Sequence, residues 1–304
     1  MCRAMGECEQ LPSTFERYHQ RFARVLSHIE SHSEESLSID ELSGIAAFSR
    51  HHFHRQFSGF LGMSAYKYTQ FMRMRRASWR LAFRPEMSVA DVALATGYEG
   101  PEAFARAFRQ FAGQSPSEFR ASPDWHEWHS RFRPFIDLRQ NHMNTIQGPP
   151  LVRVVQFPET RVASLEHIGN PLRLGDSIRK FVEWRKAHKL PPRLSATFNI
   201  VYNDPDEVPP EEFRFCLCAA TDGPIEPNAA GISELRIPAG RCALLRHVGS
   251  DDQLGRSIWH LYASWLPGSG EELRDFPLFM QRVTFFPDVP DSEAVTDIYL
   301  PLEG

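Results

Sequence analysis

The chain of 304 residues contains no apolar run of 18 residues, which excludes a helix that spans a membrane. Its five cysteines are scattered and odd in number, which argues against a disulfide framework. The first residues lack the apolar core of a secretory signal peptide. We therefore expect a cytoplasmic protein with no membrane partner.

The chain also lacks the patterns that carry most enzyme chemistry. It has no Ser-His-Asp spacing, no glycine-rich phosphate loop and no cluster of metal ligands. We therefore predict no catalytic residue, no metal site and no cofactor. Cys216 and Cys218 are either a redox or metal pair or buried free thiols, and burial is favoured. His126 and His129 are either metal ligands or packed histidines, and packing is favoured because a third ligand is missing.

Charge is divided unevenly along the chain. Residues 1–122 hold 15 basic and 13 acidic side chains, whereas the remainder holds 19 basic and 25 acidic ones. The first part is therefore slightly positive and the second clearly negative. This division is typical of a chain that contacts nucleic acid with its first part only.

One 20-residue pattern occurs twice, at residues 49–68 and 100–119, with a constant offset of 51. Phenylalanines recur at helical spacing in both copies, and each copy has Gly-x-Ser after them. A helix over residues 14–31 precedes the first copy, and short helices over 39–47 and 89–95 precede the two copies. A short helix, a tight turn and a second helix, present twice, predict two helix-turn-helix units.

The second helix of each predicted unit buries its phenylalanines and turns polar side chains outward. The outer stripes consist of His51, His54, Arg55 and Ser58 in the first unit and of Glu102, Ala105, Arg106 and Arg109 in the second. These stripes are the predicted DNA-facing surfaces.

A long helix over residues 64–83 is predicted between the two units. No acidic residue occurs between Glu41 and Glu86, whereas eight basic ones do: Arg50, Arg55, Lys67, Arg73, Arg75, Arg76, Arg80 and Arg84. We expect Arg50, Arg73 and Arg76 to contact DNA phosphates. The alternative is that the basic stripe of this helix is only a solvated face.

The stretches at residues 37–57 (LSIDELSGIAAFSRHHFHRQF), 62–64 and 89–120 (VADVALATGYEGPEAFARAFRQFAGQSPSEFR) resemble the AraC/XylS-type transcriptional regulators. The resemblance implies an all-α double helix-turn-helix domain, here residues 14–121, that binds double-stranded DNA. It also implies base contacts from the first half of each recognition helix: His51, His54, Arg55, Pro101, Glu102, Ala105 and Arg106.

Prolines punctuate residues 122–150, which we predict to be a linker. From residue 151 the pattern alternates, and a second repeat appears, because residues 157–178 match residues 237–258 at an offset of 80. Each half is predicted to form strand, turn, strand, helix and two more strands, with helices over 172–189 and 252–266. The result is an α+β fold with a duplicated βαββ-like unit, two helices on an antiparallel sheet, and a groove on the pseudo-two-fold axis. His167 and His247, matched by this repeat, are either a paired site or two residues that serve equivalent turns, and the second is favoured.

This half, residues 151–304, resembles the GyrI-like effector-binding domain. The resemblance rests on the matched second strands, the run at residues 265–267 and the closing stretch at residues 297–302. It implies a small-molecule effector. Many such domains use a buried Glu against lipophilic cations, but this chain has Met280 at the corresponding position and Arg282 two residues later.

We therefore expect a neutral or anionic effector that is aromatic or apolar. The predicted contacts are Trp184, Trp259, Tyr262, Trp265, Met280, Arg282 and Tyr299. The alternative is that another acid, Glu166 or Glu183, reaches the groove and accepts a cation.

Together the two halves predict a ligand-responsive transcription regulator and no enzyme. The effector would change DNA affinity or a contact with RNA polymerase. The alternative joins the DNA-binding half to a GyrI-like hydrolase or sequestering domain, which for hydrolysis would need a general base in the groove.

Overall fold

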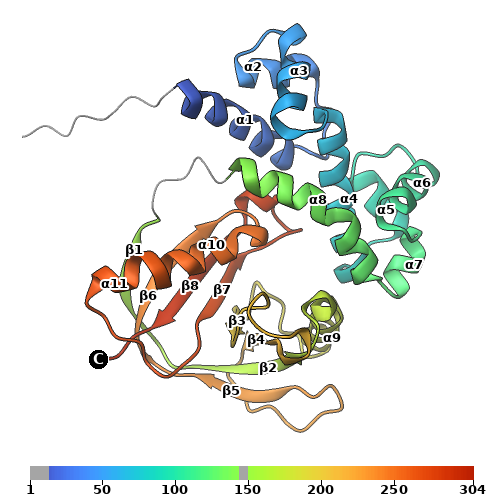
Figure 1. Cartoon of the computed structure of the whole chain (residues 1–304). Helices are drawn as coiled ribbons and strands as arrows, with labels where there is room; N and C mark the ends of the chain where they lie inside the picture. The colour runs from blue at the N-terminus through green and yellow to red at the C-terminus, as the bar shows by residue number, and fades with distance from the viewer. Residues whose placement is uncertain (1–13, 144–149) are drawn as a thin grey trace, which may run out of the picture.

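The computed structural model describes residues 14–143 and 150–304. They form a helical domain followed by a curled antiparallel sheet with helices, as Figure 1 shows. This confirms the predicted fold class. Cys2 and Cys8 lie outside the described residues.

The helical domain contains α1 (Thr14–Ser31), α2 (Ile39–Ala46), α3 (Arg50–Leu61), α4 (Ala65–Phe83), α5 (Val89–Ala95), α6 (Pro101–Ala112), α7 (Pro116–Ala121) and α8 (Trp125–Met143). Helices α3 and α6 have equal length and are 51 residues apart, as the repeat requires. Ser38 and Ser88 cap α2 and α5 by accepting bonds from the backbone N–H groups of Glu41 and Asp91.

The core of this domain is aromatic and repeats with the sequence. Phe53 and Phe57 of α3 and Phe104 and Phe108 of α6 are fully buried, each contributing about 2 kcal/mol by removal from water. Helix α4 runs between the two units, and its 19 residues span about 28 Å. The helix therefore sets the separation of the two recognition helices.

The predicted linker contains a helix instead. Residues 125–143 form α8, which contacts α1, α3 and α6. Trp125, Trp128 and Phe132 are buried in the core of the helical domain, and the indole Nε1 of Trp128 donates to Ser78. The prolines concealed this aromatic stripe, because Pro134 lies inside the helix rather than at its end.

The sheet of the second domain has eight strands in the order β1-β6-β8-β7-β3-β4-β2-β5. The strands are β1 (Val152–Phe157), β2 (Thr160–Ile168), β3 (Thr197–Val201), β4 (Arg214–Ala220), β5 (Ser233–Ile237), β6 (Gly240–Val248), β7 (Phe279–Thr284) and β8 (Val295–Pro301). The pseudo-two-fold axis passes between β3 and β7. The first strand of each half is exchanged, since β1 pairs with β6 and β5 pairs with β2.

The two faces of the sheet have different cores. One face curls around an apolar cluster to which all eight strands contribute, including Phe198, Phe279 and Tyr299. On the other face, α9 (Leu174–Ala187) packs over the first half and α10 (Leu254–Trp259) over the second. After α10 the chain continues through a π-helical turn, His260–Trp265, into α11 (Leu266–Ser269).

The matched histidines serve matched turns, as favoured from the sequence. Nδ1 of His167 lies 2.8 Å from Ser177 Oγ, and Nε2 lies 3.2 Å from the carbonyl oxygen of Asn170. His247 makes the same pair of contacts, at 2.9 Å to Ser257 and 3.1 Å to Ser250. Both rings therefore fasten a strand end to the helix that follows it.

Candidate nucleic-acid interface and effector pocket

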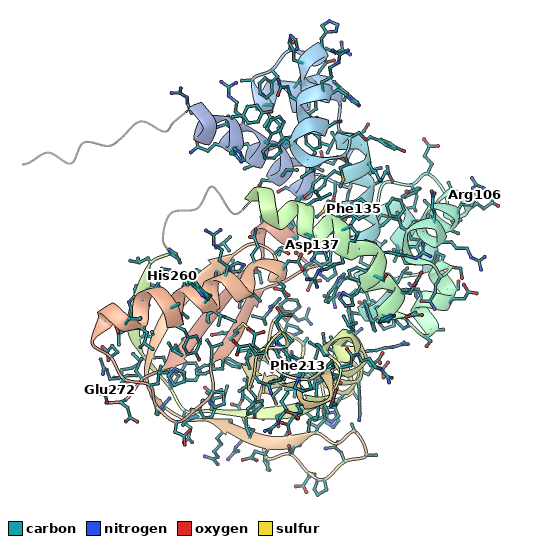
Figure 2. All side chains as sticks on the ribbon, viewed as in Figure 1. Arg106, Phe135, Asp137, Phe213, His260 and Glu272 are labelled. Carbon is teal, nitrogen blue, oxygen red and sulfur yellow. The ribbon has the colours of Figure 1, made fainter. Side chains whose placement is uncertain are left out.

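The outer faces of the two recognition helices carry the side chains expected to contact DNA. Figure 2 shows Arg106 directed away from the body of the molecule. The exposed residues of this set are Arg50, His51, His54, Arg55, Pro101, Glu102, Arg106 and Arg109, and Ala105 is half-buried. Arg50 pairs with Asp40 at 2.7 Å. Within residues 14–143 and 150–304, Arg55 and Arg106 have no recorded ion pair, so their guanidinium groups are available to base edges.

The arginines of α4 do not form the predicted phosphate-facing stripe. Arg73 donates to the carbonyl oxygens of Ser33 and Glu35, at 2.5 and 2.8 Å. Arg76 is buried and pairs with Glu34, which also pairs with Arg80. The turn after α1 supplies these acceptors, so both side chains have partners within the helical domain. A wheel of α4 alone cannot show these partners.

Burial and charge act against each other at Arg76. Burial lowers the pKa of the Arg76 guanidinium, and the nearby Glu34 carboxylate raises this pKa in part. A guanidinium removed from water in this way needs its carboxylate partner. Arg76 is therefore a structural residue of the helical domain.

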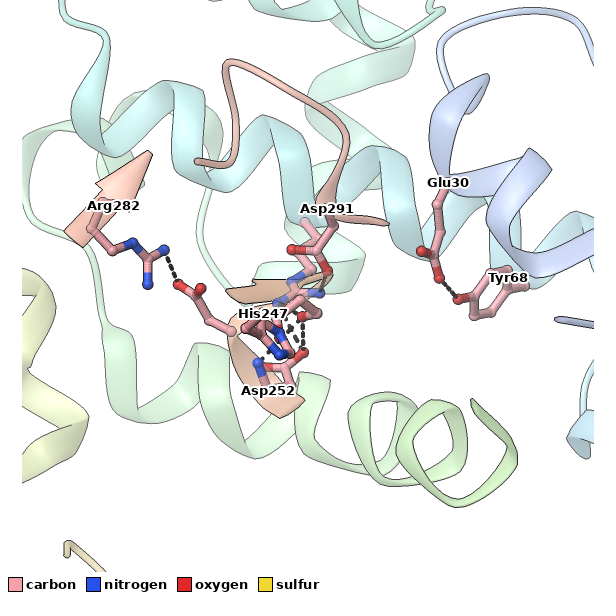
Figure 3. A network of polar contacts seen from close by, with 9 residues as sticks. Glu30, Tyr68, His247, Asp252, Arg282 and Asp291 are labelled. Carbon is pink, nitrogen blue, oxygen red and sulfur yellow. Dashed lines mark hydrogen bonds and ion pairs between the residues drawn. The ribbon is translucent and has the colours of Figure 1, made fainter. Parts of the chain in front are cut away.

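Arg75 of α4 connects the two domains through a buried ion-pair network. Its Nη1 lies 2.6 Å from Asp291 and its Nη2 lies 2.9 Å from Asp252, both of the sheet domain. Figure 3 shows this network, with His247 beside it. The Arg75 side chain is 6% exposed and that of Asp291 is 3% exposed. The domains are therefore joined by an ion pair that is buried away from water.

A pocket of about 400 Å³ lies between the two domains. The helical domain lines it with Trp79 and Phe83 of α4 and with Arg84. The sheet domain lines it from α9, β3, β4 and β7 and from the loop that contains Phe286 and Pro287. Trp79 meets Phe286 edge to face, with ring centroids 5.9 Å apart. A molecule in this pocket would touch both domains.

The floor of the pocket lies near the pseudo-two-fold axis. Asn199 of β3 lies in register with Leu217 of β4 on one side and with Met280 of β7 on the other. Directly paired residues share a face of the sheet. Since Leu217 packs with the α9 cluster and Met280 with the α10 cluster, Asn199 lies between the two helices. This is the position predicted for the groove.

Four cations line this pocket: Arg84, Arg185, Lys186 and Arg282. Among the described lining residues the carboxylate is Asp251, which accepts a bond of 2.6 Å from Arg282. Lys186 pairs with Glu86 at 2.7 Å, and Arg84 pairs with Asp288. The lining thus has an excess of positive charge.

Of the seven predicted ligand contacts, Arg282 lines this pocket and the other six do not. Trp259 and Tyr262 face outward, 64% and 40% exposed. Met280 is buried under α10, and Tyr299 is on the opposite face of the sheet. Trp184 is buried with the α9 cluster, and Trp265 packs at the edge of the α10 cluster.

Two causes explain this result. The π-helical turn changes the phase of the wheel after Trp259. In addition, α4 of the other domain supplies the aromatic wall that the prediction sought on α10. Trp79 and Phe83 stand at helical spacing in the sequence, but this spacing does not distinguish a pocket wall from ordinary core.

The alternative acids do not reach the pocket. Glu166 pairs with Arg214, and Glu183 is exposed and pairs with Arg179. Neither lines the pocket.

The remaining candidates from the sequence have structural surroundings. Cys216 and Cys218 are buried free thiols with sulfur atoms 3.6 Å apart. His129 is partly packed against the Trp128 ring, and burial lowers its pKa. Within residues 14–143 and 150–304, no group of three or more His, Cys, Asp or Glu side chains could hold a metal ion. In the same part of the chain, no helix is long and apolar enough to cross a bilayer.

Two matched helix-turn-helix units with exposed recognition helices, joined to a domain with a pocket of small-molecule size, define a DNA-binding transcription regulator. The chain belongs to the family described as GyrI-like small molecule binding domain, whose model matches residues 151–303. A helix-turn-helix domain model matches residues 42–122. The AraC-type regulator and GyrI-like resemblances are thereby confirmed.

Curated relatives agree with this class. The chain is similar to the probable transcriptional regulator YgiV of Escherichia coli (strain K12), with 37% identity over 152 residues that cover 50% of this chain and 95% of the relative. It is 31% identical over 103 residues to the uncharacterized HTH-type transcriptional regulator YbfP of Bacillus subtilis (strain 168), covering 34% and 35% of the two chains. Among solved structures, EcmrR bound to DNA in EcmrR-RPo matches 87% of this chain and 98% of its own, with 15% identity and a TM-score of 0.43.

Proposed function

We propose that a small molecule bound in the pocket between the domains controls DNA binding by this regulator. The observation that carries the proposal is the composition of the pocket wall, in which Trp79 and Phe83 of the helical domain face Phe181 and Leu217 of the sheet domain. A ligand that touches both domains has an affinity that depends on their relative arrangement. Binding and DNA affinity are then coupled, and the coupling is reciprocal.

Helix α4 is the element through which the effector would act. The same helix separates the recognition helices, carries Arg75 at the interface and supplies the pocket wall. Two adjacent residues of the sheet domain connect the pocket with the domain interface. Asp251 pairs with Arg282 in the pocket, and Asp252 pairs with Arg75 of α4. A change at Arg282 is thus one residue away from the contact with α4.

We further propose that the effector is neutral or anionic, with an aromatic or apolar body. A cation buried in the pocket would need a carboxylate, and Asp251 is already paired with Arg282. Four cationic side chains around the pocket would repel it further. Titration of the full chain with a quaternary ammonium dye, followed by tryptophan fluorescence, tests this. Micromolar binding that is lost in Leu217→Trp, which fills the pocket, would contradict the proposal.

We assign DNA binding to the helical domain, including α8, and effector binding to residues 151–304 together with the pocket wall that α4 supplies. The response takes the form of a change in DNA affinity or in a contact with RNA polymerase. A hydrolase would need a general base, and the pocket carboxylate is held by Arg282. This favours the regulator over the hydrolytic alternative, and the cytoplasm is its expected compartment.

The test begins with a genomic footprint of the full chain, which identifies its operators. DNA affinity at one operator is then measured against a small-molecule panel for the wild type and for Leu217→Trp, which fills the pocket. Ile168→Trp, at an exposed site outside the pocket, is the matched control. We expect a compound that shifts DNA affinity in the wild type and the control but not in Leu217→Trp. An equal response of all three chains would refute the assigned pocket.

A further inference from the structure

The geometry points to an organic anion as the ligand, an aromatic or apolar molecule whose carboxylate or sulfonate is received by Arg185 and Asn199. This inference rests on the proposed effector pocket and narrows its ligand class. Neither residue belongs to the set predicted from the sequence. Both line the pocket, Arg185 from α9 and Asn199 from β3.

Arg185 is a buried cation whose recorded partners are all neutral. The side chain belongs to a residue that is only 5% exposed. Its Nε donates to the carbonyl oxygen of Leu190, its Nη1 to Thr197 Oγ1 and its Nη2 to the carbonyl oxygen of Ser195, at 2.8, 2.7 and 2.8 Å. A guanidinium carries five N–H donors, so two remain after these three bonds.

The charge of Arg185 is therefore not compensated by a carboxylate within the described part of the chain. Burial lowers its pKa to about 10, a depression that a neighbouring carboxylate would oppose. The other cations of the pocket differ in this respect. Arg84, Lys186 and Arg282 each have a carboxylate partner. An anion in the pocket would give Arg185 the negatively charged partner that the other three cations already have.

Asn199 adds a second polar group at the same place. It is 7% exposed, lines the pocket and has no recorded side-chain hydrogen bond among residues 14–143 and 150–304. It follows Thr197 by two residues on β3, so both side chains share the pocket face of the sheet. Because Arg185 bonds to Thr197, the guanidinium and the Asn199 amide approach the ligand from the same end of the pocket.

The duplicated half has no arginine at the matching sequence position. The position 80 residues after Arg185 is occupied by Trp265, which packs at the edge of the α10 cluster. The apolar body of the ligand would lie against Phe83, Phe286 and Trp79, which line the opposite wall.

Arg185 also has a structural role, because two of its three bonds fasten the loop between α9 and β3. The experiment must separate that role from anion binding. Two fluorescent probes with the same ring system serve this purpose: 8-anilinonaphthalene-1-sulfonate, an anion, and N-phenyl-1-naphthylamine, which is neutral. Their dissociation constants are measured by titration of the full chain and of Arg185→Gln, Arg185→Lys, Asn199→Leu and Arg282→Gln.

We expect the wild type to bind the sulfonate at least about tenfold more tightly than the neutral probe, because one charge-assisted hydrogen bond increases affinity by about that factor. Arg185→Gln should abolish this preference, and Asn199→Leu should reduce it severalfold, while the neutral probe binds as before. Arg185→Lys loses the loop bonds but keeps the charge, and should retain most of the preference. Arg282→Gln, whose arginine already has a carboxylate, should change it little.

The outcomes separate two questions: whether the pocket binds a ligand, and whether that ligand is an anion. Loss of both probes in Leu217→Trp places them in the pocket, and retention of both would contradict the effector pocket itself. Equal affinity of the wild type for the two probes, lost together in Leu217→Trp, would overturn the anion assignment and leave the pocket in place. Because the wild-type ratio needs no variant, the inference remains testable even if Arg185→Gln does not fold.

Discussion

Gly175 of α9 lies against the indole ring of Trp125 of α8. A Cβ atom at Gly175 would overlap Cε2 and Nε1 of that ring. Trp125 in turn stacks on Phe83, with centroids 5.7 Å apart, so the pocket wall and the domain contact share one aromatic layer. The absence of a side chain at Gly175 is what allows the two domains to meet there.

Gly175→Ala should therefore disturb the docking of the domains, at a cost of about 1 to 3 kcal/mol from overpacking. The repeat offers a matched control, because Gly255 occupies the equivalent position in α10 and has no atom within 4 Å of its added Cβ. Gly255→Ala should be neutral or stabilise by about 0.5 to 1 kcal/mol through helix propensity. Urea unfolding measures both changes, and similar values for the two variants would show that the contact carries no free energy.

Arg75→Met should destabilise the chain strongly, because it removes the guanidinium that pairs with the buried carboxylate of Asp291. The expected loss is about 3 to 5 kcal/mol in the free energy of unfolding. Adding Asp291→Asn should recover part of it, since the stranded charge is then removed. Arg84→Met is the control: its partner Asp288 is half exposed, and loss of such a pair costs about 1 kcal/mol or less. The interpretation fails if Arg75→Met and Arg84→Met unfold alike.

Arg55 and Arg106 should each contact a base. Both are exposed on recognition helices and have the bidentate geometry that guanine O6 and N7 accept. Alanine at either position should cost about 1 to 3 kcal/mol on the operator and relax base preference at one position. Competition binding against random DNA measures this. Equal weakening on operator and random DNA would reassign the residue to a phosphate contact.

One monomer should cover two successive major grooves, because α4 holds the recognition helices apart as a rigid spacer and adjacent grooves are about 34 Å apart. The operator then consists of two boxes and need not be palindromic. Insertion of five base pairs between the boxes rotates one of them by half a turn and should abolish tight binding. A footprint confined to the first box, or tolerance of the insertion, would contradict this geometry.

The buried histidines predict a loss of stability in mild acid. Burial lowers the pKa of His247 below its ordinary value of 6.5, with Asp251, Asp291 and Arg282 as its charged neighbours. The unfolded chain thus takes up the proton first, so stability is complete above about pH 6.5 and falls as the pH drops below it. The slope reaches about 1.4 kcal/mol per pH unit for one such group.

His129, whose pKa burial also lowers, adds to the same effect. The measurement is therefore a difference: urea unfolding at pH 7.5 and 5.5 for the wild type and for His247→Asn. The variant should lose less stability between these two values. An equal loss in both chains would show that His247 does not contribute.

Local order and duplication could be predicted from the sequence. Helices α1 and α5 begin and end where the apolar periodicity and the caps place them. The offset of 80 correctly predicted equivalent roles for His167 and His247, because both contacts lie within ten residues of the ring that makes them. Periodicity identifies the buried face of an element, and a repeat carries that assignment to the second copy.

The partners across that buried face were decided only by the tertiary structure. The sequence showed that Arg76 and Trp79 lie on α4, but their surroundings come from the turn after α1, the sheet domain and α8. The exchange of β1 and β5 between the halves likewise leaves no trace in the pattern of either strand. The amphipathic pattern of one element shows which of its faces is buried, but it does not identify the element that packs against that face. The effector pocket, enclosed by elements far apart in the chain, could therefore be found only in the folded molecule.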